Sequence, residues 1–129
     1  MPQPRLLVID DEPKLGEFLA TIARESGFAT EVTSNDAEFR ARFEADRPAL
    51  VALDLGMPGM DGVELLRFLA EQDFRSPVLI VSGFDRRVLD SAFRLGQALG
   101  LTMAGPIEKP MRADILEETL SLIRTSLAA

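Results

Sequence analysis

Short apolar runs alternate along the chain with longer segments of helical periodicity. The runs are RLLVID (5–10), FATEVT (28–33), ALVALD (49–54), PVLIVS (77–82) and the weaker LTMAGPIEKP (101–110). The segments that follow them space apolar residues three and four positions apart, and they cover residues 14–27, 34–46, 61–72, 86–100 and 112–127. Five strands alternating with five helices predict a doubly wound α/β fold, in which one five-stranded parallel sheet is flanked by helices on both faces.

The apolar positions also predict which faces are buried. The alternation in FATEVT is typical of an edge strand, whereas ALVALD and PVLIVS indicate strands that are covered on both sides. The helical residues expected to face inward are Leu15, Phe18, Leu19, Ile22 and Ala23 in the first helix, Val88, Ala92, Leu95 and Leu99 in the fourth, and Ile115, Leu116, Thr119, Leu120, Ile123 and Leu127 in the last.

Length and charge narrow the function classes. The 129 residues are expected to form one domain over 1–129, with its core at about 4–125. A net charge of −7 argues against direct binding of nucleic acid or of an anionic membrane, because both require clustered Lys and Arg. No membrane-length apolar run and no secretion signal is recognised, so a cytoplasmic location is expected. Cysteine and histidine are absent, which excludes disulfides and thiolate or imidazole metal ligands.

Polar side chains stand where four of the predicted strands end. They are Asp10, Asp11 and Glu12 after the first strand, Asp54 at the end of the third, Ser82 at the end of the fourth and Lys109 after the fifth. Because the carboxyl ends of parallel strands meet at one edge of a sheet, these groups are expected to share a pocket. Close carboxylates repel by about 4 kcal/mol per pair at an effective dielectric near 20. Mg²⁺, which prefers carboxylate and carbonyl oxygens, would relieve that repulsion.

Such a pocket would attract a phosphoryl group. Asp54 would be the nucleophile and would form an acyl phosphate. Mg²⁺ and the ammonium group of Lys109 would offset the charge on the phosphoryl oxygens, and the Ser82 hydroxyl would donate to one of them. On this hypothesis the third strand ends at Asp54 in order to present a nucleophile.

Four segments in the same order and spacing resemble the signature segments of a known family. LVIDDEP, ALDLGMPGMDG, VLIVSG and EKPM are similar to those of the receiver domain of two-component response regulators, and the resemblance covers nearly the whole chain. It implies a flavodoxin-like fold and a signalling module that is not an enzyme beyond its own phosphorylation and dephosphorylation. It also implies Mg²⁺ as cofactor, a histidine kinase or phosphotransfer protein as phosphodonor, and an output domain or protein as partner.

The resemblance also implies a role for each site residue. Asp54 is the phosphoacceptor, Asp11 and Asp54 are direct Mg²⁺ ligands together with the backbone carbonyl of Gly56, and Asp10 holds the metal largely through water. Ser82 and Lys109 contact the phosphoryl group, and Gly83 leaves room beside it. In the loop after Asp54, Gly59 and Gly62 permit unusual backbone angles, Pro58 is expected to restrict Met57, and Asp61 is expected to cap the next helix.

Two features depart from the commonest receiver pattern. Pro106 stands three residues before the lysine, where many receivers carry Tyr or Phe, so the usual aromatic coupling is absent. The interval from Ser82 to Lys109 is about five residues longer than expected, which predicts an extended fourth helix. That helix is a candidate surface for a homodimer or an output partner. The long segment followed by IEKP also resembles, more weakly, receivers fused ahead of EAL-type cyclic-di-GMP phosphodiesterases.

Two other functions fit parts of the pattern. A haloacid-dehalogenase-type phosphohydrolase also uses Mg²⁺ and an aspartyl nucleophile, but it requires an acid two residues after the nucleophile, where this chain has Gly56. A phosphate-independent interaction scaffold would keep the fold without the switch. The presence of Asp54 and Lys109 argues against a scaffold, whereas Pro106 favours it.

Overall fold

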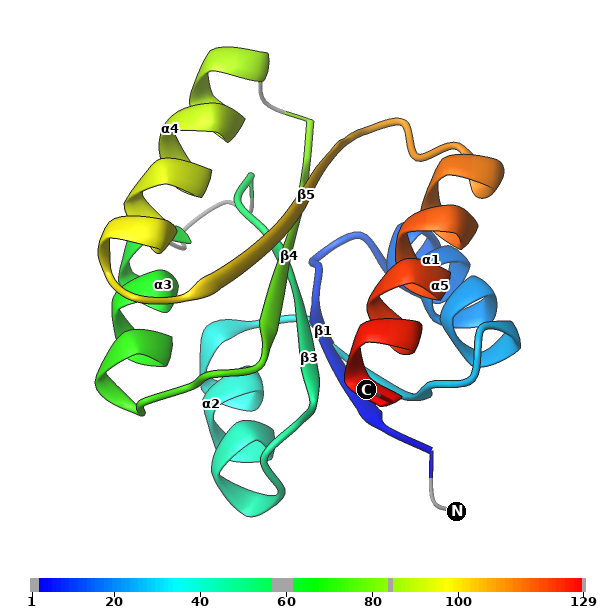
Figure 1. Ribbon diagram of the computed structural model, residues 1–129, viewed down its shortest axis with the longest axis horizontal. Helices are drawn as coiled ribbons and strands as arrows, with labels where there is room; N and C mark the ends of the chain where they lie inside the picture. The colour runs from blue at the N-terminus through cyan, green and yellow to red at the C-terminus, as the bar shows by residue number, and fades with distance from the viewer. Residues whose placement is uncertain (1–2, 57–61, 84, 129) are drawn as a thin grey trace.

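The computed structural model describes residues 3–56, 62–83 and 85–128. Within these residues, five strands alternate with five helices, as the sequence predicts (Figure 1). The elements are β1 (Arg5–Ile9), α1 (Pro13–Glu25), β2 (Ala29–Thr33), α2 (Asp36–Ala45), β3 (Leu50–Asp54), α3 (Gly62–Glu71), β4 (Pro77–Ser82), α4 (Arg86–Ala98), β5 (Thr102–Glu108) and α5 (Ala113–Ala128).

All paired strands are parallel, and the sheet has the order β2-β1-β3-β4-β5. The chain starts in β1, moves outward to β2, and then crosses back over β1 to β3. This reversal makes the gap between the carboxyl ends of β1 and β3 the place where doubly wound folds bind ligands. β2 is an edge strand, as the alternation of its residues predicts.

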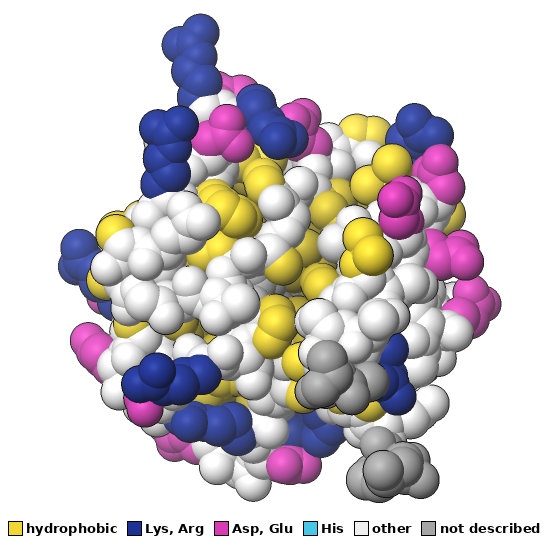
Figure 2. All heavy atoms as spheres, in the orientation of Figure 1, with side chains coloured by type: hydrophobic (Ala, Val, Ile, Leu, Met, Phe, Trp, Pro, Cys, Tyr) yellow, Lys and Arg dark blue, Asp and Glu magenta, His cyan; other side chains and the backbone are white. Residues whose placement is uncertain are grey.

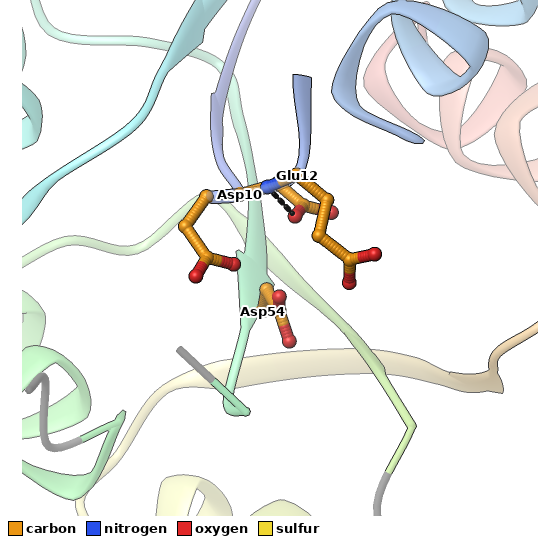
Figure 3. Close-up of side chains that lie close together, drawn as sticks. Asp10, Glu12 and Asp54 are labelled. Atoms are coloured by element: carbon orange, nitrogen blue, oxygen red, sulfur yellow. Dashed lines mark hydrogen bonds between the residues drawn. The ribbon is translucent and has the colours of Figure 1, made fainter. Parts of the chain in front are cut away.

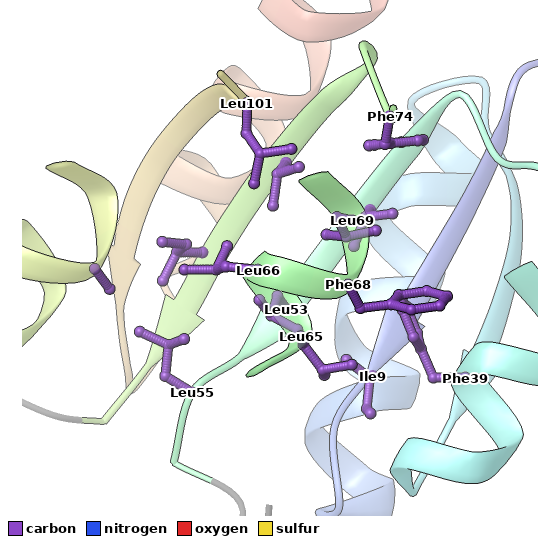
Figure 4. Close-up of a cluster of buried hydrophobic side chains, with 14 of the residues drawn as sticks. Ile9, Phe39, Leu53, Leu55, Leu65, Leu66, Phe68, Leu69, Phe74 and Leu101 are labelled. Carbon is purple, nitrogen blue, oxygen red and sulfur yellow. The ribbon is translucent and has the colours of Figure 1, made fainter. Parts of the chain in front are cut away.

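The sheet is covered on both faces. α1 and α5 lie on one face, and α2, α3 and α4 lie on the other (Figure 1). Alternate residues of β1 serve the two faces: Leu6 and Val8 pack with α1 and α5, whereas Leu7 and Ile9 join the cluster under the other three helices (Figure 4). β1, β3 and β4 are continuous apolar runs because both of their faces are buried. None of the described helices combines the length and apolar content that crossing a bilayer would require.

The prediction that a residue faces the core is wrong for three residues. Phe18, Val88 and Ile115 are 37%, 42% and 43% exposed. In α4 the neighbouring Leu89 is fully buried in place of Val88. Each of these helices packs against the sheet along a narrower line than its apolar stripe, so the outermost member of the stripe stays in solvent.

α4 has 13 residues, and Gly100 follows its end with φ +88°. The helix therefore ends two residues before the predicted range of 86–100 does. Part of the longer interval between Ser82 and Lys109 lies in β5, where the ladder with β4 shifts register between Leu79 and Val81.

Gly62 is the first residue of α3, and a Cβ added there would lie 2.6 Å from the Leu55 side chain, so the close approach of Leu55 requires glycine. The predictions for Met57, Pro58, Gly59 and Asp61 fall outside the described residues.

Leu89→Ala and Val88→Ala form a matched pair that tests which side of α4 faces the core. Leu89→Ala should lower the free energy of unfolding by about 2–5 kcal/mol, because it leaves a cavity among buried side chains. Val88→Ala should change it by less than about 0.5 kcal/mol, since Val88 is largely in solvent. Urea unfolding of both variants measures the difference, and equal effects would contradict this orientation of α4.

Candidate functional site

The carboxylates of Asp10 and Asp54 meet at the reversal point of the sheet. Asp54 is the last residue of β3, and Asp10 follows Ile9, which pairs with Leu53. The Asp10 N–H donates to the carbonyl of Thr33 at 3.0 Å, which holds the end of β1 against β2. Both aspartates are only 4% exposed. Two acidic groups are thus fixed side by side by backbone pairing.

Lys109 joins these carboxylates. Its Nζ lies 3.0 Å from Asp10 Oδ2, 3.1 Å from Asp54 Oδ2 and 3.2 Å from Glu12 Oε1. The Lys109 side chain is 9% exposed, so these ion pairs are shielded from solvent on most sides. Each contact joins an ammonium donor to a carboxylate acceptor, so all three are charge-assisted hydrogen bonds of ordinary length. A single ammonium group therefore neutralises part of a cluster of three carboxylates.

The backbone of β4 and β5 determines where Lys109 enters the site. Glu108 pairs with Ser82, and the Lys109 N–H then donates to the Ser82 carbonyl at 2.9 Å. Ser82 is fully buried at the end of β4, as its position in the apolar run predicts. Lys109 is thereby held one residue beyond the ladder, with its side chain directed across the ends of the strands.

Glu12, which the sequence places at the strand ends but to which the resemblance assigns no role, belongs to the site. It occupies the N-cap position of α1, ahead of Pro13, but its side chain makes no capping hydrogen bond. Its carboxylate reaches Lys109 instead, while its N–H donates to Asp10 Oδ1 at 2.9 Å. Figure 3 shows the Glu12 and Asp10 side chains beside Asp54. The signal in the sequence was a third acid in VIDDE at a position where a cap is expected.

The acidic residues fit a hard cation. One carboxylate oxygen from each of Asp10, Asp11, Glu12 and Asp54 lies within 4.8 Å of the others. Asp11 makes no hydrogen bond or ion pair with any residue that the structure describes, so its carboxylate is available to a ligand. Oxygen donors at this density, partly buried, are the donor set that Mg²⁺ or a similar ion prefers.

An open pocket of about 220 Å³ lies beside the cluster. It is lined by Glu12, Asp54, Gly56, Gly83 and Lys109. The Gly56 N–H donates to Asp54 Oδ1 at 2.9 Å, so each oxygen of this carboxylate already has one donor. At Gly83, an added Cβ would meet only the Lys109 Cβ, at 4.0 Å. Among the described residues beyond its chain neighbours, nothing else crowds this side of Gly83.

Burial and pairing shift the proton affinities of the site. Desolvation raises the pKa of Asp54 above its ordinary value, and the hydrogen bonds from Gly56 and Lys109 only partly oppose this effect. For Lys109, desolvation lowers the pKa, but the hydrogen bonds and charges of Asp10 and Asp54 outweigh it and raise the pKa to about 12. Lys109 is therefore a permanent cation at neutral pH.

The structure brings together the residues that the sequence places at the strand ends. Asp10, Asp11, Asp54, Ser82 and Lys109 all lie at the carboxyl edge of the sheet. The cluster of carboxylates carries excess negative charge and can bind a divalent cation. That cation and the Lys109 ammonium together can then bind an anion next to the Asp54 carboxylate.

Comparison with known proteins identifies related sequences. The profile of the response regulator receiver domain family matches residues 6–121. The transcriptional regulatory protein TrcR of Mycobacterium tuberculosis is 31% identical over 120 residues, which make up 93% of this chain and 44% of TrcR. The DNA-binding response regulator MtrA of Mycolicibacterium smegmatis is 37% identical over 78 residues, 60% of this chain and 34% of MtrA. The chain thus spans less than half the length of these relatives.

Solved structures agree with the fold. A response regulator from Colwellia psychrerythraea superposes with a TM-score of 0.83 and 28% identity, over 96% of this chain and 98% of its own. The chemotaxis response regulator CheY4 of Vibrio cholerae gives a TM-score of 0.78 at 21% identity, over 94% of this chain and 98% of its own. These likenesses confirm the doubly wound five-stranded fold that the sequence predicts.

Asp54→Asn should raise the melting temperature of the metal-free protein at pH 7. Because burial raises the pKa of Asp54, the folded protein binds this proton more tightly than the unfolded chain does, so stability falls as the carboxyl ionises. The gain from Asn should be complete above the raised pKa and shrink as the pH falls towards the ordinary value of 3.8. Thermal melting in EDTA across this range measures it.

Glu117→Gln is the matched control for that experiment. It removes the same charge from an exposed position on α5, so it should leave the melting temperature nearly unchanged. A lower melting temperature for Asp54→Asn than for the control at pH 7 would contradict the electrostatic description of the site.

Proposed function

The chain belongs to the response regulator receiver domain family, and on that premise we propose that it is a phosphorylation-controlled signalling module whose phosphoacceptor is Asp54. The observation that carries the proposal is the buried carboxylate of Asp54, 3.1 Å from the Lys109 ammonium and open to a pocket of about 220 Å³. The domain that performs this function is proposed to extend over the chain, with a core at about residues 4–125.

Mg²⁺ is the proposed cofactor. Asp11, Asp54 and the backbone carbonyl of Gly56 would hold it directly, and Asp10 would hold it largely through water. Bound there, the ion would withdraw charge from the phosphoryl oxygens during transfer. The proposal is supported by the Asp11 carboxylate, which has no partner among the described residues, and by the close approach of the oxygens in the acidic cluster.

In the proposed reaction a histidine kinase or phosphotransfer protein supplies the phosphoryl group. An oxygen of Asp54 forms a bond to phosphorus while the P–N bond of the donor's phosphohistidine breaks, and the released imidazole takes up a proton. Lys109 keeps its ammonium beside the acceptor oxygen and offsets the charge on the phosphoryl group. Ser82 donates its hydroxyl to a phosphoryl oxygen. The raised pKa of Lys109 supports this role, because the side chain stays charged throughout.

Output is proposed to pass through α4 and the surface next to it. Pro106 provides no aromatic side chain that could move between an inward and an outward position. A signal from Ser82 would therefore reach α4 through the short connection that leads into this helix. Figure 2 shows apolar side chains across the face that β5 crosses between α4 and α5. The partly or largely exposed apolar residues of these three elements include Val88, Met103, Ala104, Pro106, Ile115 and Leu122. A second copy of the chain or an output domain would cover them.

Incubation with acetyl phosphate and Mg²⁺ should add one phosphoryl group, about 80 Da, to each chain. Asp54→Asn should remove the adduct, because the amide is not a nucleophile towards phosphorus. Intact mass spectrometry measures both, with Glu117→Gln as a variant that keeps the adduct. An adduct that persists in Asp54→Asn would refute the assignment of the phosphoacceptor.

Phosphorylation should change hydrogen exchange in residues 82–104 and leave α1 and α2 largely unchanged. The reason is that the Ser82 hydroxyl follows the phosphoryl group and pulls on the entry to α4, and a shift in population needs only a few kcal/mol between two states. Exchange is measured with and without beryllofluoride, an analogue of the phosphoryl group. Unaltered protection in 82–104 while Asp54 is occupied would rule out α4 as the readout.

A further inference from the structure

β5 contains one more residue than its partner β4 at the place where it approaches the site. At the start of the ladder Val78 pairs with Met103 and Leu79 with Ala104, a difference of 25 in residue number. At its end Ser82 pairs with Glu108, a difference of 26. One extra residue is therefore absorbed between these pairs, in the Gly105–Pro106 segment, as a β-bulge.

The bulge decides which residue of β5 enters the phosphoryl pocket. If the difference of 25 continued, Ser82 would pair with Ile107, and Lys109 would lie about 3.3 Å further along the strand. A slip of one residue also turns every side chain to the opposite face of the sheet. Ile107 would then leave the core, and the Lys109 ammonium would no longer reach Asp54.

Gly105 is the residue that allows the bulge. Its φ is +82°, a conformation that side chains with a Cβ rarely adopt. A Cβ at this position would also lie 2.8 Å from Leu79 Cδ1, 3.2 Å from the Ile107 nitrogen and 3.4 Å from the Ile80 carbonyl oxygen. Two of these three neighbours are backbone atoms of the ladder itself, so they cannot move aside without breaking it.

We propose that Gly105 is a positioning residue: by forming the β5 bulge, it places the Lys109 ammonium at the phosphoacceptor. The inference rests on the proposed function of Lys109. It adds that glycine is required at position 105, away from the phosphoryl group. Pro106, which stands where other receivers carry an aromatic ring, is the other residue of the bulge. In this chain, that position serves to set the register of β5.

Five variants test the proposal. Gly105→Ala introduces a side chain at a positive φ and brings its Cβ into close contact with Leu79 and the backbone of the ladder. Gly100→Ala is the matched control, because Gly100 has φ +88° but nothing lies within 4 Å of an added Cβ. Deletion of Pro106 removes the extra residue, so the ladder can run from Leu79 to Ser82 without a bulge. The double variant, Gly105→Ala with Pro106 deleted, tests rescue, since an alanine is acceptable in an unbulged strand. Lys109→Ala is the reference for loss of the ammonium.

The rate of labelling by acetyl phosphate is read by intact mass, and Mg²⁺ affinity by calorimetry. Gly105→Ala should be labelled roughly 100-fold more slowly than wild type, as slowly as Lys109→Ala, because an electrostatic donor is displaced. Its Mg²⁺ affinity should not fall, since moving a cation away from the carboxylates favours a metal ion. Gly100→Ala and the deletion should keep labelling near the wild-type rate, and the double variant should recover it.

The outcomes separate this inference from the proposed function. If Lys109→Ala is labelled at the wild-type rate, the proposed role of Lys109 fails. If Lys109→Ala is slow but Gly105→Ala is not, Gly105 does not position the lysine. A folded double variant that stays as slow as Gly105→Ala would overturn the register argument as well. Should Gly105→Ala fail to fold, the comparison of the double variant with the deletion alone decides the question, because both lack the bulge.

Discussion

The ammonium group of Lys109 holds the site together. It lies within 3.2 Å of carboxylate oxygens of Asp10, Glu12 and Asp54. Asp10 and Asp54 are almost fully buried. Without this cation, buried carboxylates would face one another, and burial alone already raises the pKa of Asp54. Removing the lysine would leave buried carboxylates without a countercharge, which strongly destabilises a folded protein. The acidic pocket can exist in the metal-free protein because a lysine is built into it.

The position of that lysine depends on the whole sheet. Asp10 and Asp54 are brought together by the pairing of β1 with β3, and Lys109 arrives from the far edge through β4 and β5. A register error of one residue in any of these ladders would turn a site residue away from the pocket. In β1, β3 and β4, which are buried almost throughout, a slip of one residue would exchange the side chains that pack under the two helix layers, and the close-packed core opposes such an exchange. The core therefore serves the site by fixing register, in addition to stabilising the fold.

Much of this could be predicted from sequence, and the exceptions have physical reasons. The alternation of strands and helices and the polar residues at strand ends are local patterns, so the fold and the grouping of Asp54 with Lys109 follow from them. The exposure of Val88 and the burial of Leu89 depend on how α4 is rotated on the sheet, which periodicity alone leaves open by one residue. The ion pair between Glu12 and Lys109 was not predicted, because it joins residues that are 97 positions apart. The bulge at Gly105 was missed because it is a relation between two strands.

The three partners of Lys109 differ in how readily they can be given up. Asp10 and Asp54 are buried, whereas the Glu12 side chain is 59% exposed, so water replaces its ion pair at little cost. In the proposed reaction a dianionic phosphoryl group appears on Asp54, beside the ammonium that already contacts this residue. Lys109 then needs to release only its weakest partner, Glu12, and to strengthen a contact that exists in the resting state. The electrostatic arrangement is thus formed before the phosphoryl group arrives, so little reorganisation opposes the transfer.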